Sequence, residues 1–163
     1  INGVTDPAPD SDYGHELTFL RLMKDQSNEY IKVIQKAYNV PLTTPVIYPK
    51  NNKLADQLKI VAKLINGGLK SPIYIVNHPN SHDTHSAQVN TTDKTQGTQA
   101  TNLTLLSQAI GAFQQDLETM GKSDSVSGMT FSEFGRRIKS NSSQGTDHGA
   151  AAPLFLFGKN TLL

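Results

Sequence analysis

The chain has 163 residues, of which 36% are hydrophobic and 18% are charged, values typical of one globular domain. Its 15 basic and 14 acidic residues give a net charge of +1 without a long run of either sign, which argues against a nucleic-acid partner. The sequence contains no cysteine, which excludes disulfides, thiolate metal sites and cysteine nucleophiles. No segment approaches the roughly 20 apolar residues of a membrane span, and no stretch has the pattern of a signal peptide.

The first part of the chain predicts an irregular lead-in followed by two helices. Residues 1–12 are rich in proline, aspartate and serine. Asp12 is a candidate N-cap for a helix over about 12–38, whose polar middle is a possible point of interruption. A second helix is expected over about 53–66, because its apolar residues recur at helical spacing and Gly67-Gly68 follows as a C-cap.

The rest of the chain reads as strands alternating with one more helix. Residues 71–77 are apolar and β-branched, which predicts a short strand. Residues 89–100 are polar and predict a mobile crossing or lid segment, and a third helix is expected over about 102–120. Strands are then expected up to Phe131 and over 153–157. This alternation predicts an α/β fold of three layers, α/β/α, with a mainly parallel sheet.

Two loops that follow predicted strands hold most of the side chains capable of chemistry. The first loop carries His78, His82, Asp83 and His85, and the second carries Glu133, Arg136, Arg137, Asp147 and His148. In a parallel sheet both loops leave the same edge, so we expect them to converge. Imidazole and carboxylate ligands suit Zn²⁺, and carboxylates suit Mn²⁺ or Mg²⁺. The two loops therefore predict a candidate site for a divalent metal.

A plainer interpretation exists for each of these residues. A single Asp-x-His pair is weak evidence for a metal site, and Asp147-His148 also fits a turn residue beside a surface imidazole. Glu133 also fits a loop cap, and the two arginines fit a solvated face. No serine lies in a Gly-x-Ser-x-Gly elbow, so the residues identify no catalytic nucleophile.

Several motifs make the sequence similar to a known family. The segments are HDTHSAQ, MTFSEFGRRIKSN and GTDHGAAAPLFLFG, preceded by LADQLKIVAKLINGGLKSPIYIVNH. Together they resemble an uncharacterised bacterial family, a domain of unknown function whose members often carry a twin-arginine export signal. That family is placed in the alkaline phosphatase/sulfatase-like superfamily, and the resemblance covers about 48–158. It implies an alkaline phosphatase-like α/β/α core and an exported, periplasmic location.

The resemblance also assigns roles to residues of the two loops. The superfamily's Asp-x-x-x-His motif falls on Asp83 and His85, with shorter spacing here. Its Asp-His-Gly motif falls on Glu133-Phe134-Gly135, where phenylalanine replaces the histidine ligand. The implied metal ligands are Asp83, His85, Glu133, Asp147 and His148, and the implied anion-binding residues are Arg136 and Arg137.

The function implied by the resemblance is metal-dependent hydrolysis of a phosphate or sulfate ester, on a small molecule or a glycan, with Zn, Mn or Mg as cofactor. The alternative is a non-catalytic exported binding or scaffold domain that retains the fold, and a phosphomutase-like activity ranks third. Residues 1–163 are expected to form a single domain, the later portion of an alkaline phosphatase/sulfatase-like fold, belonging either to a larger protein or to a reduced member that lacks the nucleophilic half. Because the superfamily's nucleophile would lie upstream, little turnover is expected from this chain alone.

Overall fold

The structure is a computed structural model that describes residues 6–161. Its first helix, α1 (Asp12–Tyr38), has the predicted extent, but its N-cap is Ser11, whose Oγ accepts a hydrogen bond from the Gly14 N–H at 3.2 Å. The polar stretch at 24–29 remains helical, although Asp25, Ser27 and Asn28 are weaker helix formers than Lys24, Gln26 and Glu29. Of the predicted lead-in, residues 6–10 are irregular and residues 1–5 lie outside the described part.

The second helix, α2 (Lys53–Asn66), confirms the predicted bounds. The Asn52 side chain caps its first turn by accepting a hydrogen bond from the Ala55 N–H at 3.1 Å. Gly67 is the C-cap, and Gly68 follows in the left-handed region at φ 81°. Glycine is required at position 67, since a Cβ there would lie 2.1 Å from the Ala37 carbonyl oxygen. The ends of α1 and α2 can therefore approach closely.

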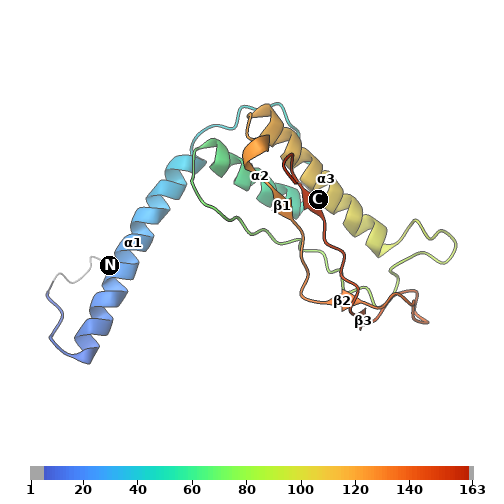
Figure 1. Ribbon diagram of the computed structural model, residues 1–163, viewed down its shortest axis with the longest axis horizontal. Coiled ribbons are helices and arrows are strands. Elements are labelled where there is room, and N and C mark those ends of the chain that lie inside the picture. The colour runs from blue at the N-terminus through green and yellow to red at the C-terminus, as the bar shows by residue number, and fades with distance from the viewer. Residues whose placement is uncertain (1–5, 162–163) are drawn as a thin grey trace.

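The third helix, α3 (Thr98–Thr119), starts earlier than predicted and takes in the last part of the polar segment 89–100. It packs along α2, and these two helices form the centre of the molecule (Figure 1). The buried apolar side chains at this contact are Leu54, Leu58, Val61, Phe113 and Leu117. By contrast, α1 extends away from the pair, so much of its apolar surface is exposed (Figure 1).

A buried carboxylate anchors the connector between α1 and α2 to α3. Asp116 is fully buried and accepts hydrogen bonds from Thr44 and, at 2.8 Å, from the Tyr48 hydroxyl. Burial, followed by the contact with Asp116, raises the pKa of Tyr48 well above its usual value. The hydroxyl therefore stays protonated and can donate to the carboxylate.

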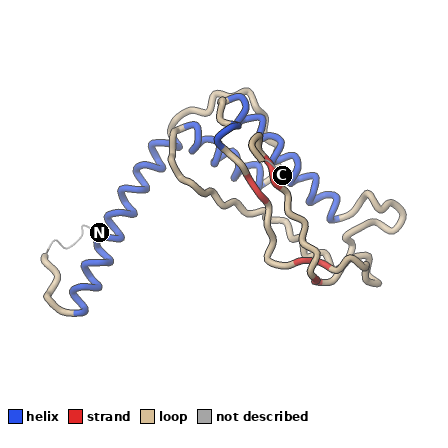
Figure 2. The backbone as a smooth tube through the Cα atoms, viewed as in Figure 1, coloured by secondary structure: helices blue, strands red, loops and turns tan. Residues whose placement is uncertain are grey.

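Between residues 6 and 161, the strands are four dipeptides arranged in two antiparallel pairs. After the short 3-10 helix η1 (Ser123–Ser125), β1 (Gly128–Met129) pairs with β4 (Leu156–Phe157). Between them, β2 (Gly135–Arg136) pairs with β3 (His148–Gly149). The stretch 126–158 therefore runs out and folds back on itself as one antiparallel arm beside the helices (Figure 2).

The predicted three-layer α/β/α fold with a mainly parallel sheet is wrong. The two pairs of strands in the described residues are short and antiparallel. The segment 71–77 is extended but is assigned to no strand. Tyr74 and Val76 pack against the helical core, whereas Ile73 and Ile75 are 70% and 78% exposed. The alternation of this segment is thus strand-like, but a strand also needs a hydrogen-bonded neighbour, which local sequence does not specify.

Within residues 6–161, no helix combines the length and the apolar character that a membrane crossing requires.

Candidate metal centre

The first side of the site is a tight turn after the extended segment 71–77. The Asp83 N–H donates a hydrogen bond to Ser81 Oγ at 3.1 Å. The N–H groups of Thr84 and His85 donate to the carbonyl oxygens two residues before them. Thr84 is 5% exposed, whereas Asp83 and His85 are exposed. The alternate residues Asp83 and His85 therefore point outward together while the residue between them is buried.

The second side of the site is the β2–β3 pair. The antiparallel register places His148 opposite Arg136. The imidazole of His148 stacks on the ring of Phe134, with centroids 4.1 Å apart and planes inclined by 16°. Phe134 thus supports one face of the His148 ring.

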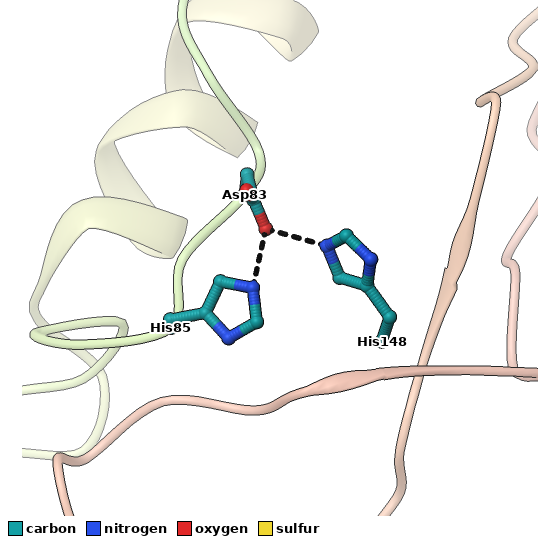
Figure 3. Close-up of side chains that lie close together, drawn as sticks. All are labelled: Asp83, His85 and His148. Carbon is teal, nitrogen blue, oxygen red and sulfur yellow. Dashed lines mark hydrogen bonds and ion pairs between the residues drawn. The ribbon is translucent and has the colours of Figure 1, made fainter.

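The two sides meet at one oxygen of Asp83. Asp83 Oδ1 lies 2.8 Å from His148 Nε2 and 3.0 Å from His85 Nε2 (Figure 3). One ligand atom from each of these three residues lies within 4.8 Å of the others. The hydrogen bond from His148 is the main cause that lowers the pKa of Asp83, and the nearby positive groups add to it. The predicted convergence of the two loops is therefore confirmed for these residues, although no parallel sheet produces it.

The Arg136 side chain contacts both sides of the site. Its Nη1 donates to the Thr146 carbonyl at 2.7 Å, and its Nη2 donates to the His82 carbonyl at 2.7 Å. Nη2 also lies 2.9 Å from Asp83 Oδ1, and the side chain is only 16% exposed. Most of this guanidinium is thus engaged within the protein. Its predicted role in binding an anion stays a prediction.

Asp147 lies on the far side of His85. Its Oδ1 is 3.2 Å from His85 Nδ1 and accepts a hydrogen bond from Asn141 Nδ2 at 3.0 Å. The bond from Asn141, followed by that from His85, lowers the pKa of Asp147. Asp147 is therefore ionised near neutral pH and contacts His85 through the ring nitrogen that faces away from Asp83.

The remaining predicted residues are Glu133 and Arg137, and both are exposed. The group of close metal-type side chains found in the described residues does not include Glu133. Arg137 contributes a positive charge that helps to lower the pKa of Asp147. The roles of Glu133 in metal binding and of Arg137 in anion binding stay predictions.

Sequence reasoning missed Asn141 and Gly145. Asn141 Oδ1 accepts hydrogen bonds from the N–H groups of Ser143 and Gly145, both at 3.0 Å. Gly145 is buried against the first loop, where a Cβ would lie 2.3 Å from His85 backbone atoms. The segment NSSQG has the composition of a side-chain-capped turn, which is the one local signal for both residues.

The fold and the site define a largely helical domain with a loop-built cluster of one carboxylate and two imidazoles. The chain belongs to the family described as "Protein of unknown function (DUF1501)", whose model matches residues 48–160, more than two-thirds of the sequence. This match includes both loops of the site and confirms the expected membership of a family of unknown function. No curated protein and no solved structure matches the chain.

Proposed function

We propose that this protein binds a divalent metal ion through Asp83, His85 and His148, and that the metal-bound site acts on a phosphate or sulfate ester. The observation that carries the proposal is the meeting of three ligand atoms from two distant loops within 4.8 Å. These donors are one carboxylate oxygen and two imidazole nitrogens, a set found in catalytic Zn²⁺ sites and shared with other transition-metal ions such as Fe²⁺.

The three ligand atoms must rearrange to surround such an ion. Ligand atoms around tetrahedral zinc, each about 2.1 Å from the ion, are separated by about 3.4 Å. Both imidazoles lie nearer than this to Asp83 Oδ1, at 2.8 and 3.0 Å. All three side chains are roughly half exposed, so their rotamers can change to surround an ion without disturbing a packed core.

The number of ligands favours a reactive site over a purely structural one. Structural zinc sites are closed by four protein ligands, whereas catalytic sites have three and an open position. The cluster supplies three, and the exposed side chains leave room for an incoming group. A divalent metal bound there would polarise an ester oxygen and stabilise the charge that develops on it. The ester class itself follows from the superfamily resemblance given above.

A non-catalytic binding domain is the second candidate, and one observation favours it. Asp83 Oδ1 already accepts contacts from Arg136, His85 and His148, all within 3.0 Å. This hydrogen-bonded network can hold the two loops together by itself. In that case the cluster is a structural link and the domain recognises a partner without chemistry.

Metal titration of the chelator-treated protein tests the first proposal. We expect one Zn²⁺ per chain by isothermal titration calorimetry, and a loss of affinity of at least 100-fold in Asp83→Asn and in His148→Gln. These changes keep the size of each side chain while removing a charge or an imidazole. Asp10→Asn and His15→Gln are matched controls, because that exposed pair lies at the start of α1.

The outcome separates the two candidates. A folded wild-type chain that binds neither Zn²⁺ nor Mn²⁺ would reject the metal site and support the non-catalytic domain. Where metal binds, hydrolysis of aryl phosphate and aryl sulfate is measured in the presence of that metal. Turnover that persists undiminished in Asp83→Ala and His148→Ala would exclude this site as its origin.

A further inference from the structure

Asp147 and Asn141 form a chain of hydrogen bonds behind His85. Asn141 Nδ2 donates to Asp147 Oδ1 at 3.0 Å, and that same oxygen lies 3.2 Å from His85 Nδ1. The opposite ring nitrogen, Nε2, is the atom that faces Asp83. An imidazole binds a metal through one nitrogen, and the group that accepts a hydrogen bond from the other nitrogen sets its tautomer and ring orientation.

We infer that Asp147 is a positioning residue that holds His85 with its proton on Nδ1, and that Asn141 orients Asp147 for this purpose. The inference rests on the proposed metal site and assigns the order Asn141, Asp147, His85, metal. Asp147 thereby leaves the set of candidate ligands, because its carboxylate is placed against the nitrogen of His85 that points away from Asp83.

Asn141 has the contacts that such a role requires. Its Oδ1 accepts the N–H groups of Ser143 and Gly145, which closes the turn between them and fixes the plane of the amide. Its Nδ2 then has two acceptors, Asp147 Oδ1 and the His85 carbonyl oxygen at 2.9 Å. One side chain therefore links the turn 141–145, the carboxylate and the backbone of the histidine.

The tautomer of His85 tests this arrangement without any metal. In the metal-free wild type, Asp83 and Asp147 compete for the protons of this ring, so the measurement uses Asp83→Ala, which leaves one carboxylate. Long-range ¹H–¹⁵N NMR of this variant is expected to show the neutral His85 ring protonated on Nδ1, the nitrogen that faces Asp147. Adding Asp147→Ala to this variant is expected to move the proton population towards Nε2.

Metal affinity supplies the second measurement. Asn141→Asp keeps the acceptor that closes the turn but replaces the donor with a like charge against Asp147, so Zn²⁺ affinity should fall by about 10–100-fold. Asp147→Asn keeps the size of the side chain and should weaken binding less than Asp147→Ala. Asn90→Asp is the matched control, since Asn90 Oδ1 also caps a turn, by accepting the Thr92 N–H at 3.0 Å.

Each outcome has a distinct meaning. A His85 ring protonated on Nε2 in Asp83→Ala, or a tautomer that does not respond to Asp147→Ala, overturns the inference even if metal binds. Coupling of ¹¹³Cd to His85 Nδ1 in the metal-loaded protein also overturns it. If the wild type binds no metal while the tautomer responds as expected, the proposed function fails and the hydrogen-bonded chain remains.

Discussion

At the scale of single residues, Asp116 and Tyr48 show how this small core accommodates a charge. Asp116 lies fully buried on α3, and Tyr48 comes from the connector before α2. A buried carboxylate is tolerated only where donors replace its hydration, and Tyr48 and Thr44 supply them. The pair therefore joins the connector to the third helix across a long separation in sequence.

Replacing Tyr48 with phenylalanine should remove one donor from that carboxylate. We expect Tyr48→Phe to lower the free energy of unfolding by about 1.5–3 kcal/mol, the usual value of a hydrogen bond to a charged group. Urea denaturation followed by circular dichroism measures the change. Tyr13→Phe removes a hydroxyl from a side chain that is 68% exposed, and should change stability by less than about 0.5 kcal/mol. Equal effects of the two changes would contradict this account.

The same pair predicts a dependence on alkaline pH. The pKa of Tyr48 is raised in the folded protein, so the folded state holds this proton more tightly than the unfolded chain. Its contribution to stability is complete below the pKa of the unfolded tyrosine, about 10, and is lost progressively above that value. The difference in stability between wild type and Tyr48→Phe should therefore narrow as the pH rises above about 10. A constant difference up to pH 11 would contradict the prediction.

At the scale of elements, the site depends on the close approach of two loops. The Thr146 N–H donates to the Thr84 carbonyl at 3.3 Å, and Arg136 bonds to both loops. Gly145 lies at the tightest point, where the first loop leaves no space for a side chain. Neither loop contains regular structure of its own beyond the dipeptides β2 and β3, so their mutual contacts determine their conformation.

Adding one methyl group at Gly145 should separate the loops. In Gly145→Ala the new Cβ would lie 2.3–2.4 Å from backbone atoms of Thr84 and His85, so we expect a loss of about 1–3 kcal/mol and weaker metal binding. Gly111→Ala is the control, because it meets no atom within 4 Å on α3 and should stabilise the helix by about 0.5–1 kcal/mol. Thermal denaturation and metal titration measure both. Unchanged metal affinity in a folded Gly145→Ala protein would show that the loops need not touch.

At the scale of the whole molecule, the segments 41–49 and 71–77 each have an inward and an outward face with different surroundings. Val46, Tyr74 and Val76 pack against the α2–α3 core, whereas Ile47, Ile73 and Ile75 are 87%, 70% and 78% exposed. The helices lie on one side of the segment 71–77 that follows α2 (Figure 1). Ile73 and Ile75 are alternate residues on the outward side of one segment, and we expect this exposed pair to favour association between protein molecules.

Polar substitutions on the outward side should reduce that association without loss of fold. We expect Ile73→Thr/Ile75→Thr to lower concentration-dependent light scattering while stability stays within about 0.5 kcal/mol per change. The inward change Val76→Thr is the matched control and should destabilise by about 1–3 kcal/mol, because it places a hydroxyl against the core. An outward double variant that unfolds as readily as the inward one would show that Ile73 and Ile75 are packed.

The sequence predicted the helices better than the sheet. The predicted bounds of α1 and α2 agree with the structure, since apolar spacing, the Asn52 cap and Gly67-Gly68 all act within a few residues. Apolar runs at 71–77 and 153–157 carry no comparable information about their neighbours. The first is extended without a strand partner, and the second ends in β4, which pairs in the antiparallel sense with β1.

The sequence by itself determined the three amphipathic segments, the two polar loops and the ligand types that they carry, because these properties depend on neighbouring residues. Tertiary structure alone decided that Asp83 Oδ1 meets both His85 and His148, and that Asn141 and Asp147 lie behind His85. The contacts of Asp83 with His148 and of Asn141 with His85 join residues more than 50 positions apart. They follow from the antiparallel arm and the Arg136 contacts, which no local pattern encodes.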